Sequence, residues 1–328
     1  MKRVLVTGAA GFIGSHLVEA LVRKGYGVIG LDNLSYGGLQ NLSAVIGHSQ
    51  FQFIRGDVRD VELLTGIGSQ VEVVFHLAAF KIPRYGNALE TLEVNLKGTK
   101  NILRISEANG CRVIFASTSD VYGKNPQLPY SEDNEFYMGS PQVQRWSYAI
   151  SKMLGEHLCF LYHRERGVPV TILRYFGSYG PRQNLTWWGG PQAIFIDCAL
   201  KNRPMSIHGD GLQTRSFTYI QDTVGGTAKV LESEDALGKV INIGNREEIT
   251  ILDLGRKIWK LVRGSDPPRI EFIPYHQFPG RYEDVRRRIP DTRLAREILG
   301  FSARVSLKEG LPPTIEWQRN LSRERGVD

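Results

Sequence analysis

The sequence contains little cysteine and no long apolar segment. Its three cysteines, Cys111, Cys159 and Cys198, show neither a CxxC pair nor a Cys/His spacing that would bind a metal. They indicate reduced thiols, a cytoplasmic location and no metal site. No apolar stretch approaches the length of a bilayer-spanning helix, so we expect no membrane partner. The chain runs from Met1 directly into an apolar strand, which leaves no room for a signal peptide.

A strong excess of one charge is also missing. The chain has 41 Lys and Arg against 34 Asp and Glu, a formal net charge of +7. No basic tract with interleaved aromatic residues occurs, so we expect no nucleic-acid partner, while the excess suits a small phosphorylated ligand. With 328 residues, of which 41% are hydrophobic, the chain can bury a sizeable core as one large domain or two lobes.

Short β-branched runs alternate with amphipathic segments in the first half of the chain. This pattern predicts a helix from about residue 13 to 23 and strands at residues 4–6, 28–31, 51–54, 71–75, 111–116 and 168–173. Strands and helices that alternate at this pitch imply right-handed crossovers. We therefore predict an α/β fold with a Rossmann-type, doubly wound parallel sheet.

The composition changes after about residue 180, where segments rich in Gly, Pro and Trp interrupt shorter helices. Residues 1–176 are expected to form the sheet domain, together with returning segments at about 215–250. Residues 177–328 are expected to form mainly a smaller C-terminal substrate-binding lobe, interleaved with the first domain. The apolar run at 240–244 predicts a strand that rejoins the main sheet.

Three glycines follow the first strand and open the first helix. Gly8, Gly11 and Gly14 have GxxGxxG spacing, which lets the strand turn sharply and brings backbone N–H groups onto a pyrophosphate. Asp32, after the second strand, would accept hydrogen bonds from ribose hydroxyls and repel a 2′-phosphate. This favours NAD over NADP, with an ordinary turn residue as the alternative for Asp32.

Two further strand ends belong to the predicted cofactor site. Asp57 follows the third strand and could meet the adenine amino group, although an Asp in such a turn is ordinary. Leu77, Ala78 and Ala79 end the fourth strand with mostly small side chains, which permit close approach of a cofactor. We interpret His76, just before them, as structural.

Three side chains predict the chemistry. Tyr148 and Lys152 are four residues apart and share one face of a helix. A free phenol has a pKa of about 10, so it needs a neighbouring cation to act as a base near neutrality. Thr118, at the end of the fifth strand, can hydrogen-bond the same substrate oxygen. Together they favour NAD-dependent oxidation of an alcohol.

These motifs resemble those of the extended short-chain dehydrogenase/reductases, in the nucleotide-sugar epimerase/dehydratase/decarboxylase group. The resemblance covers nearly the whole chain and includes residues 7–14, 117–123, 148–152, 174–176, 179–182 and 215–222. It implies that bound NAD oxidises a UDP-hexose at C4, that the 4-keto sugar is then processed, and that the hydride returns. It also implies an NAD-binding domain, a nucleotide-sugar-binding lobe, and a homodimer formed through helices near residues 92–107 and 148–164.

The resemblance also assigns roles to single residues. Tyr148 would be the base, Lys152 would lower its pKa and hold the nicotinamide ribose, and Thr118 would orient the 4-hydroxyl. Further cofactor-binding residues would be Phe12, Ile13, Asn33, Val58, Asn95, Ser117 and Tyr175. Substrate-binding residues would be Lys81, Arg84, Ser119, Gly177, Arg215 and Arg288, with Arg215 on the diphosphate.

Residues 119 and 120 bear on the fate of the ketone. The related 4,6-dehydratases have Asp-Glu where this chain has Ser119-Asp120, so the acid for a leaving hydroxyl is missing at 119. Most epimerases have small neutral residues at both positions, and decarboxylases resemble Ser-Glu. The basic run 286–288 before Pro290 also resembles decarboxylases, although similar segments occur in epimerases. In a decarboxylase Asp120 would act as acid/base, and Arg288 could contact a uronate or the diphosphate.

On these grounds we predict a UDP-sugar C4-epimerase acting on UDP-glucose/galactose or the uronate pair. The alternative is a UDP-glucuronate decarboxylase that yields UDP-xylose or its 4-keto form; a dehydratase or a non-catalytic NAD-binding scaffold fits less well. Gly177 replaces an Asn of the family that touches substrate. Lys81 and Arg84 could pair with a sugar carboxylate or belong to a solvated loop. Trp187 and Trp188 could wall the sugar pocket or simply pack.

Overall fold

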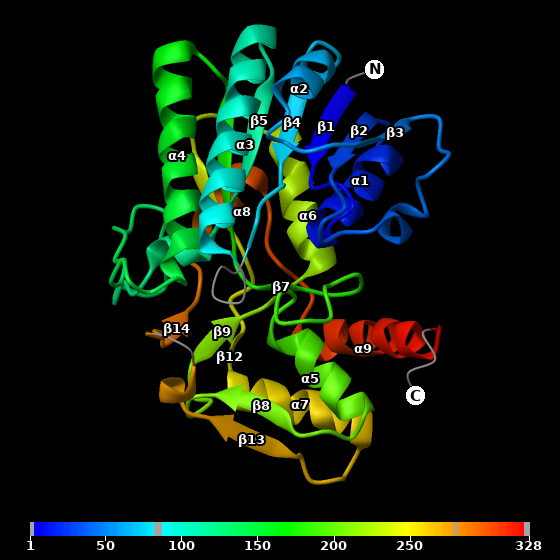
Figure 1. The fold of residues 1–328 in the computed structure, drawn as a ribbon, viewed down its shortest axis with the longest axis vertical. Coiled ribbons are helices and arrows are strands. Elements are labelled where there is room, and N and C mark those ends of the chain that lie inside the picture. The colour runs from blue at the N-terminus through cyan, green and yellow to red at the C-terminus, as the bar shows by residue number, and fades with distance from the viewer. Residues whose placement is uncertain (1–2, 82–86, 279–280, 325–328) are drawn as a thin grey trace.

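Seven parallel strands form the main sheet in the computed structural model, which describes residues 3–81, 87–278 and 281–324. The strand order is β3-β2-β1-β4-β5-β6-β11 (Figure 1). The bounds are β1 Arg3–Thr7, β2 Gly27–Asp32, β3 Phe51–Arg55, β4 Val73–His76, β5 Arg112–Thr118, β6 Val170–Tyr175 and β11 Val240–Ile243. The α/β Rossmann-type prediction is confirmed.

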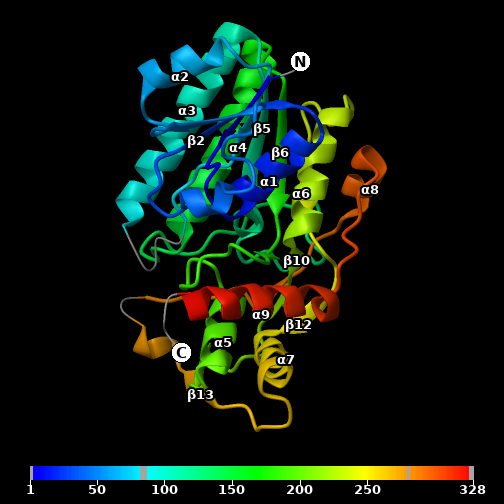
Figure 2. The ribbon, with the colours of Figure 1, turned by 90° about the vertical axis from the view of Figure 1, so that its right-hand side faces the viewer.

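Successive residues of the strands point to opposite faces, and both faces are buried. Val4 and Val6 belong to one hydrophobic cluster, and Leu5 between them belongs to another. Helices α1 (Phe12–Arg23) and α6 (Ile220–Lys229) cover the first face, while α2 (Val61–Gly68), α3 (Ala88–Asn109) and α4 (Trp146–Arg166) cover the second (Figures 1 and 2). Burial on both sides explains why the strands are continuous apolar runs.

The sheet reverses its direction of winding at β1. The chain passes outward from β1 to β2 and β3, then returns to place β4 on the other side of β1. Parallel sheets bind ligands outside the carboxyl ends of the strands at such a switch point. The fold therefore sets a crevice at the carboxyl ends of β1, β4 and β5.

Most of the other elements lie beyond this carboxyl edge, whereas α8 (Arg293–Leu299) lies beside the main sheet, next to α6 (Figures 1 and 2). The helices beyond the edge are α5 (Pro191–Leu200), α7 (Ile251–Arg263) and α9 (Leu307–Glu324). The strands form three small sheets: β7 (Ser178–Tyr179) with β10 (Thr218–Tyr219), β8 (Met205–His208) with β13 (Ile270–Ile273), and β9 (Thr214–Ser216) between β12 (Glu248–Thr250) and β14 (Arg287–Arg288). The domain boundary at residue 176 stays a prediction.

Strand ends differ from the sequence prediction where polar residues continue a ladder. The fifth strand was expected at 111–116, but β5 extends to Thr118 because Ser117 and Thr118 pair with Arg174 and Tyr175 of β6. All four residues are buried. A prediction from hydrophobicity alone therefore places the end of this strand two residues too early.

Two helices bear on the predicted dimer. α3 and α4 pack side by side (Figure 1), and Leu154 and Leu161 of α4 are exposed. The homodimer stays a prediction. In the described part of the chain, no helix has both the length and the apolar character needed to traverse a bilayer.

Candidate active site

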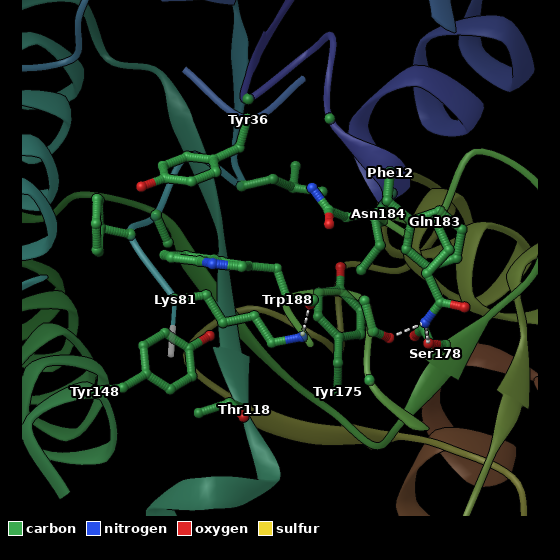
Figure 3. Close-up of a pocket in the computed structure, with 18 of the residues that line it drawn as sticks. Phe12, Tyr36, Lys81, Thr118, Tyr148, Tyr175, Ser178, Gln183, Asn184 and Trp188 are labelled. Atoms are coloured by element: carbon green, nitrogen blue, oxygen red, sulfur yellow. Dashed lines mark hydrogen bonds between the residues drawn. The ribbon is translucent and has the colours of Figure 1, made fainter. Parts of the chain in front are cut away.

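A cavity of about 1050 Å³ opens at the carboxyl edge of the main sheet, between it and α5 (Figure 3). Predicted cofactor residues that line it are Gly8, Gly11, Phe12, Ile13, Gly14, Asp32, Asn33, Asp57, Val58, Leu77, Ala78, Ala79, Ser117 and Tyr175. Predicted catalytic and substrate residues that line it are Lys81, Thr118, Ser119, Asp120, Tyr148, Lys152, Gly177, Arg215 and Arg288. Arg84 lies outside the described residues.

The glycine-rich turn fits a pyrophosphate. Gly8 has a φ of +71°, and a Cβ there would meet the backbone N of Ala78 at 2.9 Å. A Cβ at Gly14 would overlap the carbonyl of Gly8. The turn thus leaves only backbone facing the crevice, and α1 starts at Phe12 with its N-terminus toward the cavity.

Asp32 is fixed by backbone donors at the end of β2. Its Oδ2 accepts from the Ala10 N–H at 3.0 Å and its Oδ1 from the Leu34 N–H at 2.7 Å. Burial raises the pKa of Asp32, and these hydrogen bonds oppose that shift. The carboxylate stands beside the glycine turn, where the ribose of a dinucleotide would lie.

Asp57 has partners of its own within the protein. Arg59 donates to it at 2.8 and 2.9 Å, and the Asn33 amide donates at 3.0 Å. The hydrogen bonds from Arg59 lower the pKa of Asp57 to about 2, against the effect of burial. Its contact with adenine stays a prediction.

Asn95 lies behind the wall of the cavity and does not belong to the lining of the described cavity. Its amide donates to the Phe80 carbonyl at 3.1 Å and to Ser151 Oγ at 2.9 Å, and its Oδ1 accepts from the Phe80 N–H at 2.8 Å. The expected contact of Asn95 with the cofactor stays a prediction. Asn95 instead fixes the chain after β4 against α4.

His76 is buried, as its structural interpretation requires. Its Nδ1 is 2.8 Å from Thr7 Oγ1 and its Nε2 is 3.3 Å from Thr99 Oγ1. Burial lowers the pKa of His76 to about 3, and the charge of Lys152 acts in the same direction. The ring is neutral and joins β1, β4 and α3.

Tyr148 and Thr118 lie close together at the base of the cavity (Figure 3). Thr118 donates to Asp120 Oδ2 at 3.2 Å and is near enough to the Tyr148 phenol to affect its pKa. Burial raises the pKa of Tyr148, and the negative charge of Asp120 raises it further, whereas Thr118 lowers it. A phenol in this setting binds its proton tightly.

Lys152 lies one helical turn after Tyr148 and is buried. Its Nζ donates to the Ala116 carbonyl at 2.7 Å and stands 4.8 Å from the Phe115 ring centroid. Burial lowers the pKa of Lys152 to about 8, against the effects of Cys159 and Glu156. The structure thus gives Lys152 a backbone partner, and its predicted lowering of the pKa of Tyr148 stays a prediction.

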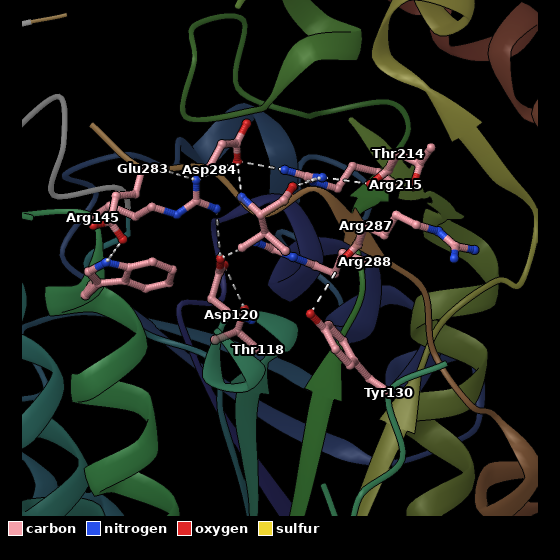
Figure 4. A network of polar contacts seen from close by, with 12 residues as sticks. Thr118, Asp120, Tyr130, Arg145, Thr214, Arg215, Glu283, Asp284, Arg287 and Arg288 are labelled. Carbon is pink, nitrogen blue, oxygen red and sulfur yellow. Dashed lines mark hydrogen bonds and ion pairs between the residues drawn. The ribbon is translucent and has the colours of Figure 1, made fainter. Parts of the chain in front are cut away.

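Arginines and carboxylates from distant segments meet next to Thr118 (Figure 4). Arg288 Nη2 is 2.7 Å from Asp120 Oδ1, and Arg145 Nη2 is 3.7 Å from the same oxygen. Burial alone would raise the pKa of Asp120, but these guanidinium groups outweigh burial and hold the pKa well below its usual range. Asp120 is therefore an anion that can accept hydrogen bonds and has no proton to give.

Arg288 lines the cavity with its side chain. Its Nε is shielded from solvent and has no hydrogen-bond partner among the described residues. Buried donors in native proteins are almost always satisfied. Arg288 also lies opposite Arg215 in the β14–β9 ladder, so both guanidinium groups reach the same chamber.

Sequence reasoning missed Arg145, Asp284 and Tyr36, all of which line the cavity. Arg145 stands three residues before Tyr148, a spacing that places both at one helix start. Asp284 precedes Arg288 by four residues in the basic segment that the sequence singles out. These spacings were the available signals, although neither specifies the contact that forms.

Tyr36 and Trp188 join the two parts of the molecule above the cavity (Figure 3). Their rings stack with centroids 4.3 Å apart, and Phe80 meets both edge-on at 5.3 and 5.2 Å. Lys81 Nζ donates to the Trp188 carbonyl at 3.5 Å. The sequence left two interpretations of Trp188, a wall of the sugar pocket or simple packing. Its position in the lining of the cavity supports the first.

Gly177 has a conformation that accounts for the absence of a side chain. Its φ is +32°, and a Cβ would meet the Ser216 carbonyl oxygen at 2.6 Å and the Phe217 ring at 3.0 Å. The family asparagine cannot stand here without movement of β9 or of Gly177 itself.

The chain is similar to known proteins over nearly its whole length. A family model described as GDP-mannose 4,6 dehydratase matches residues 5–314. A UDP-N-acetyl-α-D-glucosaminuronate decarboxylase of Bacillus cytotoxicus is 38% identical over 98% of this chain and 99% of its own length. The chain belongs to the nucleotide-sugar epimerase/dehydratase/decarboxylase family.

Other members of this family are similar over nearly the whole chain. UDP-glucuronic acid decarboxylase 1 of Danio rerio is 36% identical over 96% of this chain and 72% of the relative. A crystal structure of UDP-glucuronic acid 4-epimerase from Bacillus cereus, in complex with UDP-glucuronic acid and NAD, superposes with a TM-score of 0.87. That epimerase is 34% identical and covers 97% of this chain and 99% of its own. The family is thus established, and the similar proteins include both decarboxylases and an epimerase.

Proposed function

We propose that this chain is an NAD-dependent decarboxylase of a UDP-linked hexuronate that acts through a 4-keto sugar. The relatives at 36–38% identity cited above are uronate decarboxylases, and the similar epimerase binds a uronate together with NAD. The observation that carries the proposal is the position of Arg288, which is held by Asp120 at 2.7 Å and whose side chain lines the cavity. A carboxylate or an enolate oxygen is the partner that such a guanidinium group suits.

NAD is the cofactor, and the chain's residues fit it. Gly8, Gly11 and Gly14 would hold the pyrophosphate, and Asp32 the adenosine ribose. When bound, NAD supplies a hydride acceptor for C4 of the sugar and later a hydride donor. Tyr148 has to be ionised to take the proton of the 4-hydroxyl, which requires that the Lys152 cation lower the pKa of the phenol in the loaded enzyme; Thr118 bonds the same oxygen.

The 4-keto group makes the uronate a β-keto acid. The C5–C6 bond then breaks, CO₂ leaves, and the electron pair moves onto the C4 oxygen as an enolate. Protonation of C5 from water restores the ketone. Arg288 stabilises the negative charge that develops on the sugar, and Asp120 holds that guanidinium in place.

The ionised state of Asp120 argues against a dehydratase. Elimination of a hydroxyl needs an acid to protonate the leaving group, and the pKa of Asp120 lies far below the range in which a carboxyl could do this at neutral pH. Ser119 at the preceding position has no carboxyl group. A 4,6-dehydratase is thus the weaker candidate.

A second candidate is the C4-epimerase favoured by the sequence. The epimerase structure at 34% identity supports it. Epimerisation shares every step up to the ketone. It differs in that the ring turns over and the C6 carboxylate is retained.

Product analysis separates the two. The purified protein is incubated with UDP-glucuronate, UDP-N-acetylglucosaminuronate, UDP-glucose and UDP-N-acetylglucosamine in turn, and products are identified by NMR and mass spectrometry. A product lighter by CO₂ from either uronate supports the proposal. An isobaric C4 epimer makes the protein an epimerase, and no product from any of the four contradicts both candidates.

A further inference from the structure

Arg145 occupies the centre of the ion-pair cluster. It precedes α4, and its side chain is 11% exposed. Its Nη1 donates to Asp284 Oδ1 at 2.7 Å and to the Glu283 carbonyl at 3.0 Å, while Nη2 points toward Asp120. One guanidinium thus faces two carboxylates from different parts of the chain (Figure 4).

Asp284 fixes Arg145 from the far side. Its Oδ1 also accepts from Arg215 Nη2 at 2.9 Å and from the Val285 N–H at 2.8 Å, and its Oδ2 accepts from the Tyr275 hydroxyl at 3.2 Å. Burial would raise the pKa of Asp284, but Arg215 and Arg145 outweigh it, so this carboxylate is ionised. Arg145 is therefore held by an anion that cannot move freely.

The charges explain why a second arginine stands beside Asp120. Asp120 faces Arg288 of β14, Arg145 before α4, Lys81 after β4 and the Tyr148 phenol. Arg288 has to engage both Asp120 and, under the proposed function, the substrate. A cation anchored elsewhere keeps Asp120 ionised and in position while Arg288 is shared.

Arg145 is poorly placed to act on substrate itself. Two of its bonds go to Asp284 and Glu283, its guanidinium lies 5.3 Å from the Trp146 ring centroid, and its remaining edge faces Asp120. Its influence on the reaction has to pass through the Asp120 carboxylate.

We propose that Arg145, anchored by Asp284, is a positioning residue that holds Asp120 ionised and directed at Arg288. This inference rests on the proposed function for the role of Arg288, but not on the fate of the ketone. The same arrangement also links Asp120 to Arg215, the expected diphosphate contact, because Arg145 and Arg215 share one oxygen of Asp284.

The test measures the single-turnover rate at which a UDP-uronate reduces bound NAD, followed by the absorbance of NADH, as a function of pH. Arg145→Gln should lower the maximal rate about tenfold or more at every pH at which the protein is folded, since Asp120 loses one of the two guanidinium groups that hold it in place. The substrate concentration at half-maximal rate should change little. Arg145→Lys keeps the charge and should restore most of the rate.

Arg286→Gln is the matched control, because it removes an exposed arginine that pairs with Asp210. Its rate and pH profile should equal those of the wild type. If Arg145→Gln instead raises only the half-saturating concentration and leaves the maximal rate unchanged, Arg145 is a substrate-binding residue and the inference is overturned. Circular dichroism over the assay range ensures that each variant is folded. If Arg145→Gln is unfolded, Arg145→Lys and Asp284→Asn decide: a lower maximal rate in Asp284→Asn but not in Arg145→Lys supports the inference, and an unchanged maximal rate in Asp284→Asn overturns it.

Failure of the proposed function gives a different result. If the wild type forms NADH but releases no CO₂, the decarboxylase proposal fails while the effect of Arg145 on the oxidation step is still measured. If no UDP-uronate yields NADH, both fail.

Discussion

Asp120 and Arg288 form a 2.7 Å ion pair between opposite parts of the molecule. Asp120 follows β5 of the main sheet, whereas Arg288 belongs to β14 of a small sheet beyond its carboxyl edge. Each contributes to the other's orientation. The candidate catalytic centre is therefore built from residues of both parts of the molecule.

Asp120→Asn should lower CO₂ release at least a hundredfold, because the amide leaves Arg288 and Arg145 without their shared anion. Asp120→Glu keeps the charge and should retain more activity than the amide variant. The rate is measured with labelled UDP-glucuronate. Equal rates for Asp120→Asn and the wild type would remove Asp120 from the mechanism.

Tyr148→Phe should lower the turnover rate by a factor of about 10²–10⁴, the usual contribution of a general base, while the protein still carries NAD. Retained cofactor is checked by extraction and absorbance. Tyr137→Phe is the control, because this tyrosine is 47% exposed and does not line the cavity. Full activity of the Tyr148 variant would contradict the proposed base.

Gly177→Ala should lower the free energy of unfolding by about 2–4 kcal/mol, which combines the cost of a left-handed residue with that of overpacking. Gly47→Ala isolates the first cost, because Gly47 has a φ of +85° and a Cβ there would meet nothing within 4 Å. That control should lose only about 1–2 kcal/mol. Urea unfolding measures both, and equal losses would mean that Ser216 yields without strain.

His76 should make the protein less stable in acid. Its pKa is about 3 in the folded chain and near the usual histidine value of 6.5 when unfolded, so below pH 6.5 the unfolded chain binds a proton that the folded chain does not. Stability is fully present above pH 6.5 and should fall by about 2 kcal/mol between pH 6.5 and 5, at roughly 1.4 kcal/mol per unit.

Urea unfolding at several pH values measures this slope. His76→Gln should flatten it, whereas His48→Gln, at an exposed position, should leave it unchanged. A slope that is the same in His76→Gln and the wild type would assign the acid sensitivity to other groups.

The sequence predicted what depends on neighbouring residues. The glycines at 8, 11 and 14 form the expected turn, and Asp32 stands at its expected strand end, because both follow from a strand, a turn and a helix in direct succession. The seven strands of the main sheet were each expected within about two residues of their bounds, since burial on both faces leaves an apolar signature.

What the sequence did not predict depends on distant contacts. Asp284 acquires its importance by meeting Arg145, which is 139 residues away, and no local pattern specifies that meeting. The bonds of Asn95 to Phe80 and Ser151 were likewise not expected from the sequence, which predicted only a contact with the cofactor. In each case the residue type indicated that the side chain makes polar contacts. Which partner it contacts depends on the packing of distant segments, which no local pattern specifies.

The last strand of the main sheet in chain order is β11. It pairs with β6 at the edge of the sheet, although more than sixty residues separate the two strands in the sequence. A gene fragment ending at residue 176 would lack this strand and α6, and would leave the buried β6 as an open, apolar edge prone to aggregation. Neither part is a transferable module. A chimera that exchanges sugar preference between relatives should therefore take the segments before α6, between α6 and β11 and after β11 from the donor. It should keep α6 and β11 themselves from the recipient.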